Sequence, residues 1–184
     1  MRIISLFLLF SILSISLSAQ NKKFEFIAFG DMPYRLPADY TRFETLIKQV
    51  NKEKPAFSVH VGDFKSGSTL CSDEYFNKIH GYFETFSQPL IYTPGDNEWT
   101  DCNREAAGSY NPLERLSTLR KLFFSNTKSF GKKKMELNTQ AEDPAFSEYV
   151  ENLSWEYGGV QFATIHLVGS NNNFRHGGDN TEFL

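Results

Sequence analysis

Three aspartates stand at equivalent positions in this sequence. Each follows a glycine at the end of an apolar, strand-like run: FEFIAFGD (24–31), AFSVHVGD (56–63) and PLIYTPGD (89–96). Carboxylate oxygens suit Mg²⁺, Mn²⁺ or Ca²⁺, and mixed oxygen and nitrogen sets suit iron or zinc. Asp31, Asp63 and Asp96 are therefore the candidate ligands of one or two divalent metal ions. Alternatively, each Gly-Asp pair is a strand-to-helix turn in which Asp caps a helix, although capping does not explain the repetition.

The elements between these runs must bring the aspartates together. Apolar residues at helical spacing predict a helix around residues 43–50 and a second around 75–86, with Ser72 as its N-cap. The order is then β-α-β-α-β, whose strands are normally parallel. The three Gly-Asp pairs would lie at the carboxyl ends of the strands, the edge at which open α/β sheets bind ligands.

The rest of the chain is less regular. A third helix is predicted to begin at Asn111-Pro112, and the polar residues 125–146 are predicted to form a loop insert. Residues 147–155 and 160–168 flank Gly158-Gly159 and indicate a hairpin. The Asn/Gly-rich tail has no closing element, so the fold is expected to be incomplete at its C-terminus.

Composition and charge exclude some classes of protein. The chain has 184 residues, 40% hydrophobic and 15% aromatic content and a formal net charge of −3, which is enough for one domain with a core. A basic footprint for nucleic acid is absent, because the one cationic run, 132–134, is short and typical of a solvated loop.

The first residues resemble a targeting segment. A basic start, a short apolar stretch and a small-residue exit predict a secretory signal peptide over residues 1–19, with the domain in 20–184. An uncleaved anchor helix is the alternative, but the run is short for a bilayer crossing. We therefore expect a periplasmic or secreted protein without a stable membrane span after cleavage. In that compartment Cys71 and Cys102 predict a disulfide worth roughly 3 kcal/mol; two buried free thiols are the alternative.

The segments FGDMPY, HVGDFKSG and TPGDNEWTDC together resemble the first three blocks of the calcineurin-like metallophosphoesterase family. The resemblance covers roughly residues 24–102. It implies a two-sheet α/β sandwich with a dinuclear metal centre, in which Asp63 would bridge both metals. The metals are not distinguished among Mn, Fe, Zn and Mg.

Two blocks depart from the family pattern. Pro33 stands where the family has a histidine ligand, and Asp96 stands where it has an asparagine ligand. Asn97 matches the family's histidine general acid or transition-state stabiliser, and Glu98 matches its supporting carboxylate. Asn97 can donate a hydrogen bond but cannot transfer a proton near neutral pH. These departures agree with one another and resemble an exported bacterial subgroup of the family.

Other residues near the blocks have two readings each. Lys65 is a candidate contact to a substrate phosphate, or a solvated loop lysine. Tyr34 and Trp99 are candidates for the walls of the site, although aromatic packing explains them equally well.

The family's later histidine blocks are not found. Strand alternation places His60 in the core, away from Asp63, and His80 lies beside the apolar face of the second helix. His166 is interpreted as a packing residue or as a residue that contacts the metal ligands without binding the metal. No role is assigned to His176.

The leading hypothesis is an exported, metal-dependent hydrolase of phosphomonoesters or phosphodiesters, in which a metal-activated hydroxide attacks phosphorus. Its substrate would be a phosphorylated small molecule. The missing histidines motivate an alternative from another class, a phosphoesterase-like binding module without turnover. A third possibility is an N-terminal fragment that is inert on its own.

Overall fold

The computed structural model describes residues 23–173. The predicted signal peptide and His176 lie outside these residues. None of the helices within 23–173 has the length and apolar character that a membrane crossing needs.

The first half of the chain forms a parallel sheet flanked by helices. Its strands are β1 (Ile27–Phe29), β2 (Ser58–His60) and β3 (Leu90–Tyr92), in the order β1-β2-β3. Both neighbouring pairs are parallel. The β-α-β-α-β prediction is therefore confirmed, and the three Gly-Asp pairs follow the carboxyl ends of adjacent strands.

The three α-helices are α1 (Ala38–Glu53), α2 (Asp73–Phe83) and α3 (Pro112–Phe123). The predicted caps are present: the Ser72 side chain accepts a hydrogen bond from the N–H of Tyr75, and the Asn111 side chain accepts from the N–H groups of Leu113 and Glu114. Capping satisfies backbone donors that a helix start leaves without partners. Short 3-10 helices complete the described chain: η1 (Thr100–Asn103), η2 (Glu105–Ala107), η3 (Gln140–Glu142), η4 (Pro144–Phe146) and η5 (Ser170–Asn173).

The second half forms an antiparallel sheet of β4 (Asn138–Thr139), β5 (Leu153–Tyr157) and β6 (Val160–Ala163). The hairpin prediction is confirmed, but its strands are shorter than predicted. Gly158 and Gly159 have φ of 61° and 79°, a backbone region that glycine enters without steric cost. The loop prediction for residues 125–146 is wrong in part. Strand β4 joins the hairpin, and Phe130 forms a β-bridge with Leu90, the first residue of β3. A bridge within the segment, between Lys128 and Glu136, and pairing with residues outside it together order these residues.

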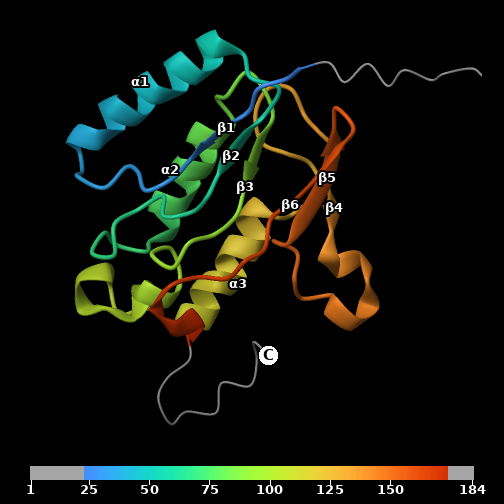
Figure 1. The fold of residues 1–184 in the computed structure, drawn as a ribbon. Helices are drawn as coiled ribbons and strands as arrows, with labels where there is room; N and C mark the ends of the chain where they lie inside the picture. Colours follow the sequence, from blue (N-terminus) through green and yellow to red (C-terminus); the bar gives the residue numbers. More distant parts are fainter. Residues whose placement is uncertain (1–22, 174–184) are drawn as a thin grey trace, which may run out of the picture.

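Aromatic side chains fill the space between the layers. Helices α1 and α2 lie on one side of the parallel sheet and the antiparallel sheet lies on the other (Figure 1). On the helix side, the His60 ring packs against Phe83 of α2, with centroids 5.0 Å apart. On the opposite side, Phe57 contacts Trp155 and Phe162 at 5.6 and 5.1 Å. The molecule is thus a mixed α/β protein with a parallel and an antiparallel sheet, and its core lies below the Gly-Asp edge.

Candidate functional site

The three predicted aspartates leave their strands at one edge of the parallel sheet. Asp31 and Asp63 have φ of 58° and 57°, the left-handed region, in which Asp is more common than most residues. The N–H of Asp31 donates to the carbonyl of Gly62 at 3.2 Å, so the first two loops are joined beyond the strand ends. Asp31 is exposed, whereas Asp63 and Asp96 are half-buried.

The charges of Asp31 and Asp96 both influence the carboxylate of Asp63. Burial raises the pKa of Asp63, and the negative charges of Asp96 and Asp31 raise it further. A hydrogen bond from the N–H of Asn97 to Oδ1 of Asp63, 3.1 Å long, acts in the opposite direction. The topology therefore brings together three anionic groups from separate loops, as the sequence predicted.

The Tyr34 hydroxyl links the first block to the other two. It donates to Oδ1 of Asp31 at 2.9 Å and lies 3.5 Å from Oδ2 of Asp63. It also accepts from Nδ2 of Asn97 at 3.1 Å. Burial and the nearby carboxylates raise the pKa of Tyr34 above its ordinary range. Tyr34 therefore forms part of the site, which is one of the two roles expected from the sequence.

Glu98 is a buried hub beneath the carboxylates. Both of its oxygens lie 3.1 Å from the backbone nitrogen of Asp63, and Oε1 also accepts from the N–H of Gly95 and the hydroxyl of Tyr92, at 2.8 and 2.9 Å. Burial raises the pKa of Glu98 to about 8. Because Glu98 is 0% exposed, it positions the second and third blocks and does not face the surface.

Lys65 has neither of the two roles expected from the sequence. It is 0% exposed, so it is neither a solvated loop lysine nor a contact for an external phosphate. Its Nζ donates to the carbonyl oxygens of Ser66 and Asn97 at 2.9 and 2.6 Å. Burial lowers the pKa of Lys65 to about 8, against the attraction of nearby carboxylates. The physical reason is topological: the loop folds inward over the third block, whose carbonyl oxygens need a donor.

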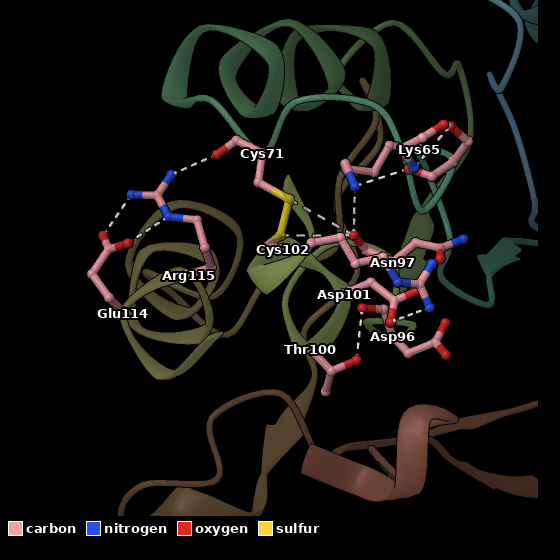
Figure 2. Close-up of a disulfide and its surroundings, with 12 residues drawn as sticks. Lys65, Cys71, Asp96, Asn97, Thr100, Asp101, Cys102, Glu114 and Arg115 are labelled. Carbon is pink, nitrogen blue, oxygen red and sulfur yellow. Dashed lines mark hydrogen bonds and ion pairs between the residues drawn. A yellow bond between two sulfur atoms is a disulfide. The ribbon is translucent and has the colours of Figure 1, made fainter. Parts of the chain in front are cut away.

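The predicted disulfide between Cys71 and Cys102 is present and lies directly behind Asn97 (Figure 2). The two Cα atoms are 5.8 Å apart. Both sulphur atoms contact the carbonyl oxygen of Asn97, at 3.9 and 3.8 Å. The disulfide thus ties the chain before α2 to η1 and supports the backbone of the third block.

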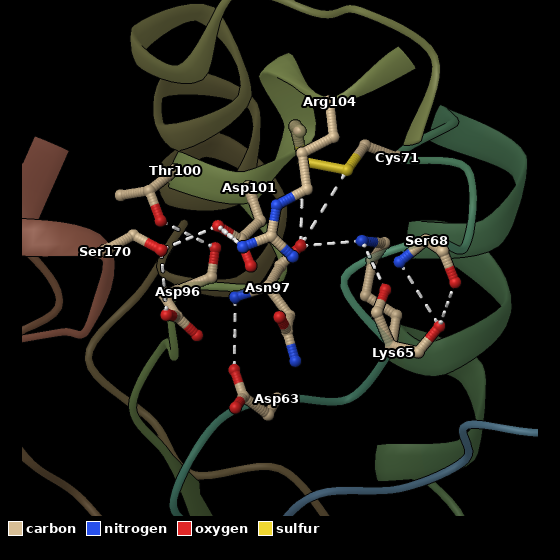
Figure 3. Close-up of polar contacts among 12 residues, drawn as sticks. Asp63, Lys65, Ser68, Cys71, Asp96, Asn97, Thr100, Asp101, Arg104 and Ser170 are labelled. Atoms are coloured by element: carbon tan, nitrogen blue, oxygen red, sulfur yellow. Dashed lines mark hydrogen bonds and ion pairs between the residues drawn. A yellow bond between two sulfur atoms is a disulfide. The ribbon is translucent and has the colours of Figure 1, made fainter. Parts of the chain in front are cut away.

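Three further residues extend the site, and the sequence analysis missed them: Asp101, Arg104 and Ser170. Figure 3 shows Ser170 between Asp96 and Asp101, with its Oγ 3.2 Å from Oδ2 of Asp96 and 2.7 Å from Oδ1 of Asp101. Arg104 pairs with the same Oδ1 of Asp101 at 2.7 Å. The i,i+3 spacing of Asp101, near the end of the third block, and Arg104, just after it, was the available signal. Nothing in the sequence connected Ser170 to the block.

Pro33, His60 and His80 have structural contacts in the interior. Pro33 is buried, and its carbonyl accepts from the hydroxyl of Tyr75 at 3.4 Å. His60 is 0% exposed, as predicted, and its Nδ1 accepts from the N–H of Gly62 at 3.1 Å. His80 packs between the rings of Phe123 and Phe130, which agrees with its structural interpretation.

His166 packs against Trp99 of the third block. The His166 ring stands 5.4 Å from the Trp99 ring, and its Nδ1 lies 3.0 Å from Oε1 of Glu151. Glu151 also pairs with Arg120 at 2.7 Å. Trp99 is 0% exposed, so it belongs to the core and does not line the site.

The donor chemistry is compatible with a hard cation, although no ready cage is present. Within residues 23–173, no group of three or more His, Cys, Asp or Glu side chains is arranged to hold a metal ion. Burial raises the pKa of Asp63 and the negative charge of Asp96 raises it further, and a divalent cation beside the two carboxylates would relieve their repulsion. Asp31 is engaged by Tyr34. The three-carboxylate metal site therefore stays a prediction.

No protein-family model, curated protein or solved structure matches the chain.

Proposed function

We propose that the protein is an exported, metal-dependent phosphoesterase that resembles a calcineurin-like metallophosphoesterase in its first three blocks. The observation that carries the proposal is the convergence of the three Gly-Asp aspartates at the carboxyl edge of a parallel sheet. Asp63 lies between the loops of Asp31 and Asp96, and burial together with the negative charges of Asp96 and Asp31 raises its pKa. Asp63 and Asp96 would hold the cation first, with Asp31 completing the set after exchange of the Tyr34 hydroxyl.

A bound divalent cation would neutralise the carboxylates and activate water for attack on phosphorus. The chain's own residues orient the reactants. The Nδ2 of Asn97 is a hydrogen-bond donor beside Asp63, and a phosphoryl oxygen would replace the Tyr34 hydroxyl as its acceptor. Glu98, Lys65 and the disulfide hold the Asn97 backbone and its neighbours, so this donor needs little reorganisation during the reaction.

A paired measurement tests the proposal. Mature protein starting at residue 20 is assayed with an aryl phosphate and Mn²⁺, and its melting temperature is recorded with and without Mn²⁺. Asp63→Asn keeps the shape of the side chain but removes its charge. We expect it to lose at least about 100-fold in activity and to lose the Mn²⁺ stabilisation. The control is Asp143→Asn, an exposed aspartate in the second half of the chain, which should match the wild type.

The alternative, a phosphoesterase-like binding module without turnover, predicts different outcomes. Stabilisation by Mn²⁺ that depends on Asp63, without hydrolysis of any phosphoester, would favour a binding module. Hydrolysis that survives Asp63→Asn unchanged would refute the assignment of this site.

A further inference from the structure

We propose that Arg104 binds the phosphoryl group of the substrate; this inference depends on the proposed function and adds a residue to it. The carboxylate edge is strongly anionic, and Lys65, the lysine of the second block, is buried. A phosphate dianion that approaches this edge needs a cationic contact on the protein. Arg104 presents a guanidinium beside the third block (Figure 3).

A buried carboxylate anchors this guanidinium. Nη2 of Arg104 lies 2.7 Å from Oδ1 of Asp101, whose side chain is 5% exposed. The same oxygen lies 2.7 Å from Oγ of Ser170, which in turn lies 3.2 Å from Oδ2 of Asp96. The anchor of Arg104 is therefore connected to the predicted metal ligand Asp96 through one hydroxyl group.

The remaining surface of Arg104 is open. Its side chain is 51% exposed, so an external phosphate can reach it. An arginine fork matches the spacing of two phosphate oxygens, and a partner on one nitrogen fixes the plane of the other donors.

Gly67 explains how the guanidinium reaches the site. A Cβ atom at Gly67 would collide with Nη1 of Arg104 and would lie 3.1 Å from Oδ1 of Asn97. Nη1 of Arg104 and the side chain of Asn97 therefore meet at the same glycine. The Oδ1 end of the Asn97 amide faces Gly67, whereas its Nδ2, the proposed neutral donor, is directed at the Tyr34 hydroxyl. The guanidinium and the Asn97 amide are therefore neighbours across Gly67.

A purely structural ion pair is the competing explanation, and the chain offers a matched example. Arg42 pairs with Asp39 at 2.8 Å with the same i,i+3 spacing, and its side chain is 65% exposed while that of Asp39 is 10% exposed. Exposed pairs of this kind contribute little to stability. Arg42 has no contact with Gly67 or Asn97 among the described residues, so it serves as the control.

The test uses the mature protein with Mn²⁺ and inorganic phosphate as the probe. Calorimetry gives the phosphate dissociation constant, and the aryl phosphate assay gives KM and kcat separately. We expect Arg104→Gln to weaken phosphate binding and raise KM by roughly 10- to 100-fold, the range for a charged hydrogen bond. Arg104→Lys should fall between the two proteins, since it keeps the charge and loses the fork. Arg42→Gln should match the wild type in both readouts.

A second variant tests the geometry without removing the charge. Gly67→Ala should displace the flexible end of Arg104 and weaken phosphate binding by about 3- to 10-fold, with little change in melting temperature. This variant separates the placement of the guanidinium from its presence.

The outcomes of the two proposals are distinct. Normal hydrolysis with unchanged phosphate affinity and KM in Arg104→Gln overturns the inference and leaves the proposed function intact. Phosphate binding that depends on Arg104 in a protein without hydrolysis supports the inference and overturns the proposed function. A wild-type protein that binds no phosphate overturns the inference.

Discussion

The two sides of the candidate site are built differently. The side that carries Asp96 and Asn97 is held by a disulfide, a buried lysine and a buried glutamate, all of which contact backbone atoms. The side that carries Asp31 and Tyr34 depends on side-chain hydrogen bonds. The carboxylate of Asp39 accepts from the N–H groups of Tyr34 and Arg35 at 3.1 and 2.7 Å, and the Tyr34 hydroxyl reaches Asp31.

This difference indicates which side can adapt. Buried, fully satisfied networks and cross-links resist rearrangement, whereas the exposed hydrogen bond from Tyr34 to Asp31 exchanges readily with water or a ligand. The third-block side is therefore the preorganised half of the site, and the first-block side is the half that changes when a cation or a substrate enters. Four predictions test this comparison, in order of decreasing effect.

Removal of the Glu98 carboxylate should have the largest effect. Glu98→Ala leaves the N–H groups of Asp63 and Gly95 and the hydroxyl of Tyr92 without their acceptor in the interior. We expect a loss of about 4 kcal/mol in the free energy of unfolding, measured by urea denaturation. The exposed Glu105→Ala, in the same region, should change it by less than about 0.5 kcal/mol. A loss below about 1 kcal/mol for Glu98→Ala would show that this side is not held by the hub.

The disulfide should come next. The double variant Cys71→Ala and Cys102→Ala should lose about 3 kcal/mol of stability, because the closed loop no longer restricts the unfolded chain. The melting temperature of the wild type should fall to that of the double variant when a reductant is added, while the variant itself should not respond. An equal response of both proteins to the reductant would contradict this assignment.

A pH effect should follow from His60, which lies beneath the first two loops. Burial lowers the pKa of His60 from 6.5 to about 3, and a backbone contact to Met32 opposes this shift. In the unfolded chain His60 therefore becomes protonated as the pH falls below 6.5, whereas in the folded chain it stays neutral until the pH approaches 3. The stabilisation is complete above that pH and is lost toward pH 3, at about 1.4 kcal/mol per pH unit.

His60→Asn keeps an acceptor for Gly62 and does not titrate. Between pH 6.5 and 4.5 the variant should therefore lose about 2–3 kcal/mol less stability than the wild type. Urea denaturation at each pH measures this difference. Parallel curves for the two proteins would show that His60 does not carry the acid sensitivity.

The smallest effect on stability is expected on the adaptable side. Tyr34→Phe removes the hydroxyl that engages Asp31 and should cost less than about 1 kcal/mol. Calorimetry with Mn²⁺ should show binding that is about 2- to 10-fold tighter, because Asp31 no longer exchanges a hydrogen bond for the cation. Weaker Mn²⁺ binding in this variant would mean that the hydroxyl supports the cation and does not compete with it.

Local features of this protein could be predicted from the sequence because their causes are local. Alternating apolar runs, helical spacing and the caps Ser72 and Asn111 depend on neighbouring residues, and they indicated the strands, the helices and the Gly-Asp edge. The pairing of Cys71 with Cys102 followed from an even count together with the expectation that the protein is exported. The strand pairing within residues 125–146 was not predicted, since the segment is polar and part of its pairing is with residues outside it, Leu90 and the β5 strand.

The roles of individual site residues were decided by tertiary structure. Lys65 and Glu98 are charged residues in loops, and only the packing of one loop over another placed both in the interior. Arg104 reaches Asn97 because Gly67, a residue from another block, leaves room for it. By itself, the sequence determined which carboxylates share an edge. The loops that contact each other across distant parts of the chain decided which charges are buried supports and which face the solvent, because burial and direction depend on neighbours that are remote in sequence.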